Sequence, residues 1–194
     1  FVRLCGDWTG FGRIDWLLGD YLKRDLAAGI LTLDEAREIL AHFFIKGCEW
    51  VSGPDLVYGS GDGQHYQNIV LAGVDENGQD VTNEVTYLVL DILEELNISE
   101  FPTTVRINRN SSPALLRRVA EVIRLGGGVV AIYNEDLIME SLEQYGYPHD
   151  EVWKFGNGGC WEVQIPGKTY FRYRSVDALN VLQAVTLKGY SEGT

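Results

Sequence analysis

Hydrophobic residues recur every three to four positions over much of the chain, which is the spacing of amphipathic helices. Thr32 and Glu35 match a capping box at the start of one such segment. Pro113 follows Ser112 at the start of another, where the missing amide of proline is tolerated. The spacing predicts helices over residues 13–28, 33–50, 81–95, 113–125, 134–145, 148–154 and 176–188.

Three segments have the pattern of β-strands. Residues 103–108 alternate apolar and polar side chains, residues 129–133 form the continuous apolar run of a buried strand, and residues 169–173 are rich in aromatic residues. Residues 1–12, in contrast, predict a loop rich in glycine and aromatic residues. Because strands alternate with helices in the second half of the chain, we predict an α/β fold with parallel strands.

The composition argues against several classes of partner. The 194 residues suffice for one sizeable domain or two small ones, and their net charge is −12. Nonspecific binding to nucleic acid or to an anionic membrane requires basic patches instead. No apolar run reaches the roughly 18 residues that predict a membrane span. Cys5, Cys48 and Cys160 form no Cys-x-x-Cys pair, which argues against a metal site. Such sparse cysteines fit a reducing, cytoplasmic location.

The candidate chemistry lies in residues 156–166, GNGGCWEVQIP. Three glycines precede Cys160, and Glu162 follows two residues later. If residues 160–162 are extended, the thiol and the carboxylate lie on one side of the backbone and Trp161 packs on the other. The alternative is a buried structural cysteine that follows a glycine turn. These residues alone leave both interpretations open.

Several further stretches accompany this loop in a fixed order. They are residues 10–15 (GFGRID), Lys46, 61–68 (GDGQHYQN), 69–75 (IVLAGVD), 82–84 (TNE), 104–107 (TVRI) and 158–162 (GGCWE). Taken together, they resemble the pyruvate formate-lyase-like glycyl radical enzymes, over nearly the whole chain. The resemblance implies part of an α/β barrel: a half-barrel with surrounding helices and a cysteine loop that enters its centre.

The resemblance also implies a chemistry. A thiyl radical on Cys160 would abstract hydrogen from a small hydroxylated substrate, and Glu162 would act as acid or base in an elimination, as in a dehydratase or lyase of anaerobic metabolism. Gly158 and Gly159 would give the loop its geometry. Pyruvate formate-lyase itself has two adjacent cysteines, so Gly159 argues against pyruvate cleavage. Trp161 stands where small aliphatic residues are common. A decarboxylase or C–C lyase of the same family stays open.

The resemblance does not extend to a radical-bearing glycine. The family stores its radical in an Arg-Val-x-Gly-Tyr-like segment, which Gly189-Tyr190 matches poorly. We therefore expect residues 1–194 to be a single partial domain of the barrel, without the C-terminal glycine-radical domain and inactive alone. The chain would bind no cofactor itself. An S-adenosylmethionine-dependent iron–sulfur activase would install the glycine radical outside it. Expected partners are the substrate, this activating enzyme, the rest of the barrel with the radical domain, and a second copy in a homodimer.

Five further residues are candidates for substrate binding: Gln64, His65, Gln67, Asn68 and Arg106. The three amides could orient a substrate or tie loops together. His65 could act in acid–base chemistry or simply be solvated or packed. Arg106 could pair with a carboxylate in the core or with one on the substrate.

Two alternatives to the radical enzyme are also open. One is a non-catalytic binding domain that retains the fold, and the other is a thiol enzyme that uses Cys160 with His149. Asp136 and Glu140 predict a solvated helix face.

Overall fold

A four-stranded parallel sheet forms the centre of the computed structural model, which describes residues 10–48, 67–159, 161–169 and 176–186. The spatial order of the strands, β1-β2-β3-β4, follows their order in the chain. All three strand pairs are parallel, as the sequence predicted. The strands are β1 (Gly10–Arg13), β2 (Asn68–Ala72), β3 (Thr103–Ile107) and β4 (Val130–Asn134).

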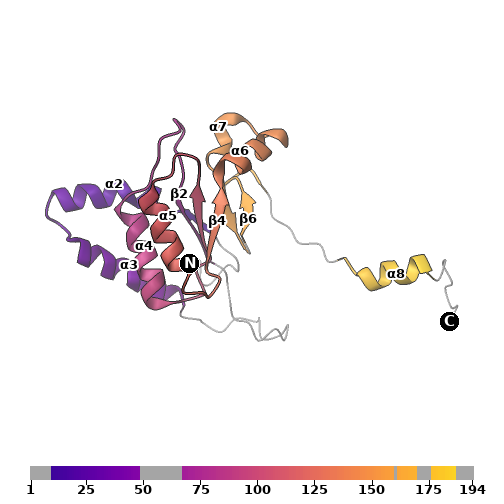
Figure 1. Cartoon of the computed structure of the whole chain (residues 1–194), viewed down its shortest axis with the longest axis horizontal. Helices are drawn as coiled ribbons and strands as arrows, with labels where there is room; N and C mark the ends of the chain where they lie inside the picture. Colours follow the sequence, from indigo (N-terminus) through magenta and orange to yellow (C-terminus); the bar gives the residue numbers. More distant parts are fainter. Residues whose placement is uncertain (1–9, 49–66, 160, 170–175, 187–194) are drawn as a thin grey trace.

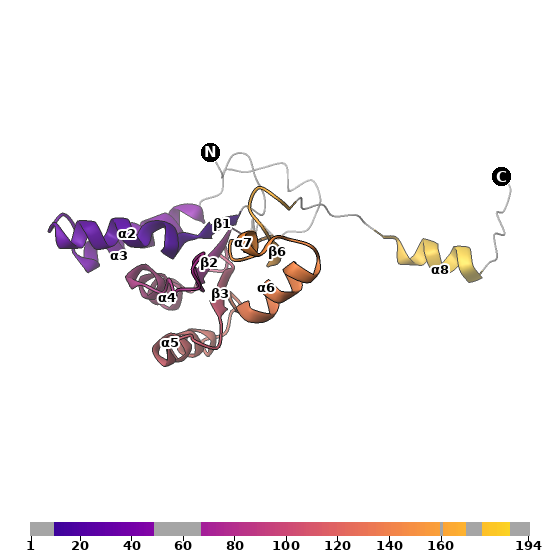
Figure 2. The same cartoon turned by 90° about the horizontal axis from the view of Figure 1, so that it is seen from above.

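Helices cover one face of this sheet, and a smaller unit covers the other (Figure 1; Figure 2). The connections between the strands place their helices on the same side, as Figure 2 shows. These helices are α2 (Ile14–Ala27), α3 (Leu33–Gly47), α4 (Glu84–Leu96) and α5 (Pro113–Ile123). The opposite face, here called the inner face, carries α6 (Glu135–Gln144), α7 (His149–Val152), β5 (Gly156–Gly158) and β6 (Glu162–Gln164). The last helix, α8 (Ala178–Thr186), buries none of its residues.

The main core lies between the sheet and the helices α2–α5. Ile69 and Leu71 of β2 belong to it, whereas Val70 does not, because neighbouring strand residues point to opposite faces. Four phenylalanine rings close the end of this core, with the centroids of Phe44 and Phe101 4.7 Å apart. The other two rings are Phe11 and Phe43. Burial of such rings supplies much of the hydrophobic stabilisation of a domain.

Helix starts agree with the sequence where a capping residue marks them. Thr32 and Glu35 form the predicted capping box, and the Ser112 hydroxyl accepts a hydrogen bond from the Leu115 amide, 3.1 Å away. The predicted helix at residues 81–95 instead begins at Glu84. The Asn83 side chain caps it there, and Thr82 belongs to a turn held by Asp80.

The strand predictions differ from the structure in several places. Residues 10–12, predicted as loop, and Arg13, predicted to begin a helix, form β1, because backbone pairing with β2 overrides the weak strand preference of two glycines. No strand was predicted at residues 68–72, which form β2. The apolar run at residues 129–133 does form a strand, β4, but not a buried one. It is the last strand described on its side of the sheet, and Ile132 is 49% exposed. Of the predicted strand 169–173, only Thr169 lies within the described residues, and it belongs to no strand.

Not every apolar residue at helical spacing is buried. Ile14 and Leu22 of α2 are buried, but Leu17 and Tyr21, which lie at three-to-four spacing along the same helix, are exposed. Ile39 of α3 is exposed as well. Within the described part of the chain, no helix is long and apolar enough to cross a membrane.

Candidate active site

The segment that carries the Gly-Gly-Cys-x-Glu motif lies against the inner face of the sheet. Strands β5 and β6 form an antiparallel hairpin, here called the inner hairpin (residues 156–164), and β5 lies over β1 and β2. The fit leaves no space for a side chain at Gly10, where a Cβ atom would lie 2.6 Å from the Asn157 carbonyl oxygen. Gly10 therefore allows β5 to approach β1 closely. Within the hairpin, a Cβ atom on Gly158 would lie 2.9 Å from the Gln164 side chain.

Two buried arginines hold the chain just before this hairpin. Arg13, at the end of β1, donates to the carbonyl oxygens of Trp153 (3.3 Å) and Ala72 (3.1 Å). Arg106 of β3 donates to the Phe155 carbonyl oxygen at 3.0 Å, and its guanidinium carbon lies 3.9 Å from the centre of the Phe155 ring. Burial, and then the charge of Arg13, lower the pKa of Arg106 to about 10, so Arg106 stays charged at neutral pH.

Two buried carboxylates balance these arginines. Glu135 pairs with Arg106 and accepts hydrogen bonds from the Val74 amide (3.0 Å) and the Asn108 side chain (2.6 Å). Of the two alternatives for Arg106, the structure thus shows a core carboxylate as its partner. Asp15 accepts from the Ala72 amide at 2.6 Å and from the Thr86 hydroxyl at 2.7 Å. These contacts fix the carboxyl end of β2.

The turn after β2 has a backbone that few residues adopt. Ala72 and Gly73 have φ angles of 58° and 86°, in the left-handed region. A side chain on Gly73 would place its Cβ 2.6 Å from a Glu135 carboxylate oxygen, so only glycine fits. Burial raises the pKa of Asp15, although its hydrogen bonds and the charge of Arg13 act in the opposite direction. The arginines and carboxylates therefore form one connected network at the carboxyl ends of β1, β2 and β3.

The tip of the inner hairpin differs from the extended conformation expected for residues 160–162. Trp161 has a φ of 74°, so the alternation that would put Cys160 and Glu162 on one side does not apply. The Trp161 carbonyl oxygen accepts from the Tyr133 hydroxyl (2.5 Å) and from the Asn157 amide group (2.7 Å). Burial, and then the charge of Glu162, raise the pKa of Tyr133. Cys160 itself lies outside the described residues.

The predicted amide residues divide into different environments. The Gln67 side chain donates to the Gly47 carbonyl oxygen at 2.9 Å and so ties the end of α3 to β2. Asn68 is buried, and within the described part of the chain neither its amide oxygen nor its amide nitrogen has a hydrogen-bond partner. The buried Thr104 hydroxyl is in the same situation. Gln64 and His65 lie outside the described residues.

The surface candidates lie apart from the inner hairpin. His149 is 86% exposed, and its Nδ1 atom lies 2.6 Å from a carboxylate oxygen of Glu143. Glu140 is exposed and Asp136 half-buried, in agreement with the predicted solvated face of α6. Among the described residues, no group of three or more His, Cys, Asp or Glu side chains could hold a metal ion.

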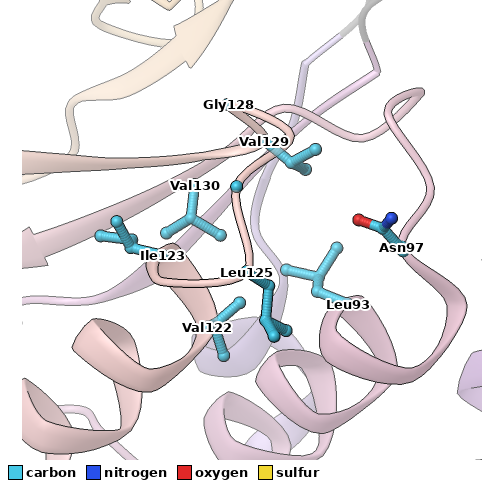
Figure 3. A pocket seen from close by; sticks show the side chains of 9 residues that line it. Leu93, Asn97, Val122, Ile123, Leu125, Gly128, Val129 and Val130 are labelled. Carbon is cyan, nitrogen blue, oxygen red and sulfur yellow. The ribbon is translucent and has the colours of Figure 1, made fainter.

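One small cavity lies far from this network in the fold. It has a volume of about 40 Å³ and lies between the ends of α4 and α5 and the start of β4, lined mainly by apolar side chains such as Leu93 and Val122 (Figure 3). Such a volume suits a water molecule rather than a substrate. An apolar groove of about 380 Å³ runs nearer the hairpin, beside β1, and includes Phe11, Trp16 and Trp153.

Four residues around the hairpin were not among the predicted site residues: Arg13, Tyr133, Glu135 and Asn157. Arg13 lies within the GFGRID stretch, which marked the region but not the role. Tyr133 and Glu135 gave only the signal of polar groups at the junction of a strand and a helix. Their partners lie far away in the sequence, 140 residues for Arg13 and Trp153, so spacing could not reveal them.

Comparisons with known proteins agree with the ordered motifs. The family model described as pyruvate formate lyase-like matches residues 4–194. Trans-4-hydroxy-L-proline dehydratase of Clostridioides difficile is 29% identical over 189 residues, which cover 94% of this chain and 24% of that protein. The chain thus spans about a quarter of the length of this relative.

Two solved structures are similar to this chain in fold as well as in sequence. A glycyl radical enzyme from Archaeoglobus fulgidus superposes with a TM-score of 0.76 at 29% identity, over 84% of this chain and 21% of that one. A structure from Roseburia inulinivorans, described for 1,2-propanediol dehydration, has a TM-score of 0.74 at 31% identity, over 81% and 19% of the two chains. The predicted α/β fold, as part of a glycyl radical enzyme barrel, is confirmed. The chain belongs to the pyruvate formate lyase-like family.

Proposed function

We propose that this chain is the catalytic-cysteine portion of a glycyl radical enzyme that eliminates water or another leaving group from a small hydroxylated substrate. One observation carries the proposal: strands β5 and β6, on either side of Cys160 in the sequence, pair against the inner face, and two buried arginines bind the backbone just before them. A reactive residue needs such a fixed support. The names of two relatives, which refer to the dehydration of trans-4-hydroxy-L-proline and of 1,2-propanediol, support the substrate class.

In the proposed reaction, the thiyl radical of Cys160 takes a hydrogen atom from a substrate carbon next to the hydroxyl-bearing carbon. This step forms an S–H bond and leaves the unpaired electron on the substrate. Glu162 donates a proton to the departing hydroxyl group, which leaves as water, and takes a proton from a neighbouring hydroxyl group, which restores its carboxyl group. The product radical then takes the hydrogen atom back from the thiol, so the net change is the loss of one water molecule.

The glycine radical, installed outside this chain by an S-adenosylmethionine-dependent iron–sulfur activase, supplies the unpaired electron. The described residues contribute support and polar groups. Arg13 and Arg106 bind the backbone just before the hairpin, and the buried Asn68 amide provides polar groups on the inner face. Gln64 and His65 stay proposed contacts of the substrate region, whereas the contact of Gln67 with Gly47 assigns it to support and the contacts of Arg106 assign it to the support of the hairpin.

The test uses the full-length protein that contains this chain, activated without oxygen and supplied with trans-4-hydroxy-L-proline or 1,2-propanediol. We expect dehydration of at least one of these compounds. Glu162→Gln should reduce turnover per glycyl radical by about 10²-fold or more, because acid–base catalysis contributes roughly 10²–10⁴-fold. Glu151→Gln, a change at a partly buried surface carboxylate that pairs with Lys168, serves as the control. Full dehydration by the Glu162→Gln variant would refute the proposed role.

A further inference from the structure

The backbone of Trp161 adopts a conformation that a large side chain rarely takes. Its φ of 74° lies in the left-handed region, where crowding between Cβ and the backbone disfavours residues other than glycine. Such a conformation persists only where surrounding contacts hold it. Trp161 stands between Cys160 and Glu162, so whatever holds it also sets the direction in which the chain continues to Glu162.

Two side chains from different elements bind the carbonyl oxygen of this residue. Tyr133 comes from the end of β4, where it lies opposite Arg106 in the strand register and therefore faces the inner hairpin. Its hydroxyl donates to the Trp161 carbonyl oxygen at 2.5 Å. Asn157 comes from β5, and its Nδ2 atom donates to the same oxygen at 2.7 Å. Both carbonyl lone pairs are thus in use.

This carbonyl belongs to the peptide group that joins Trp161 to Glu162. Two donors on one oxygen define the orientation of the peptide plane, because each approaches along a preferred direction. Burial and the nearby charge of Glu162 raise the pKa of Tyr133, so its hydroxyl stays protonated and continues to donate at neutral pH. The contact also links the hairpin tip to the last strand of the sheet, whereas Arg13 and Arg106 act only at its base.

We propose that Tyr133 and Asn157 are positioning residues that hold the Trp161–Glu162 peptide and thereby fix the position of Glu162. The catalytic consequence rests on the function proposed above, whereas the structural consequence does not. If Tyr133 served only to pack its ring, removal of the hydroxyl alone would leave the hairpin unchanged. Tyr133→Phe therefore separates the two roles.

The first experiment measures hydrogen exchange of the backbone amides in the full-length protein by mass spectrometry. We expect Tyr133→Phe and Asn157→Ala to speed exchange in residues 156–164 about fivefold to tenfold, which corresponds to the loss of one buried hydrogen bond. Tyr145→Phe is the matched control, since Tyr145 is 85% exposed and lies at the end of α6. Exchange in β2 provides an internal reference. Unchanged exchange of the hairpin in Tyr133→Phe would overturn the proposal.

The second experiment tests the catalytic consequence in the activated full-length protein. With turnover expressed per glycyl radical, measured by electron paramagnetic resonance, we expect Tyr133→Phe to lower kcat about tenfold and to leave KM within about twofold. A role in folding alone would lower the radical content and leave kcat per radical unchanged, which would overturn the positioning role. If the unmodified protein dehydrates neither compound, the proposed function fails, and the exchange experiment still decides whether the two residues hold the hairpin.

Discussion

Replacement of Arg106 by methionine tests the network beneath the inner hairpin most sharply. Arg106 is 0% exposed, and it binds the Glu135 carboxylate and the Phe155 carbonyl oxygen. Methionine has a similar length and fills much of the same space without charge. The substitution therefore removes the interactions and leaves Glu135 as a buried carboxylate without its cation.

The magnitude follows from this unpaired charge. Removal of one partner from a buried ion pair destabilises a protein by about 3–5 kcal/mol. The remaining hydrogen bonds of Glu135, from the Val74 amide and the Asn108 side chain, keep the loss within that range. For a chain of this size, about 3–5 kcal/mol corresponds to a fall in the melting temperature of roughly 6–20 °C.

The assay is urea unfolding of the 194-residue chain, followed by tryptophan fluorescence. Arg109→Met is the matched control: Arg109 pairs with Asp136, the residue after Glu135 in α6, but is 78% exposed. An exposed pair contributes about 0–1 kcal/mol, so this control should change the unfolding free energy by no more than that. Glu135→Gln combined with Arg106→Met should recover part of the loss, because Glu135 is then no longer a buried carboxylate without its cation.

The reasoning would be refuted if Arg106→Met and Arg109→Met destabilised the chain equally. The reasoning would also fail if the effects of Arg106→Met and Glu135→Gln on the free energy of unfolding simply added in the double variant. Either result would mean that burial of the ion pair has little influence on stability, and that the support of the hairpin comes from other contacts.

Two further predictions concern the turn after β2 and the carboxylate beside it. Gly73→Ala should lower the free energy of unfolding, measured in urea, by more than about 2 kcal/mol, because the new Cβ would meet Glu135. The control Gly78→Ala lies at a similar φ but in open space, so it should lower the free energy of unfolding by only about 1 kcal/mol. Equal losses in the two variants would contradict the prediction. The raised pKa of Asp15 means that the folded state holds this proton more tightly than the unfolded chain. The contribution of Asp15 to the free energy of unfolding is therefore complete at pH values below the ordinary aspartate pKa, and it is lost as the pH rises through the raised pKa. Asp15→Asn should lack this part of the pH dependence of the urea midpoint, and parallel profiles would show that Asp15 does not titrate as inferred.

The sequence predicted those elements whose signals are local. Thr32, Ser112 and Asn134 mark helix starts that the structure confirms, since a capping side chain acts within three residues of its own position. Strand β1 was missed because Gly10 and Gly12 carry no apolar signal, although pairing with β2 makes them a strand. The exposure of β4 was not predicted, because the apolar residues of a strand do not show which other elements pack against it.

The candidate site was predictable only in part. The glycines around Cys160 indicated a tight loop, and the close packing of Gly158 against the Gln164 side chain within the hairpin agrees with that. The left-handed backbone of Trp161 could not be predicted, because tryptophan has no preference for it and the contacts that hold it come from Tyr133 and Asn157. Sequence order identified the family, whereas long-range contacts determine how the hairpin is supported.

The central claim is that Cys160 carries the radical chemistry. Its most direct test is the turnover per glycyl radical of the activated full-length protein with Cys160→Ala, compared with Cys48→Ala. Cys48 is a half-buried cysteine at the end of α3, and burial raises the pKa of its thiol. The account predicts that Cys160→Ala still accepts the glycine radical but shows no dehydration, while Cys48→Ala turns over normally. Dehydration by Cys160→Ala at an undiminished rate would contradict the account.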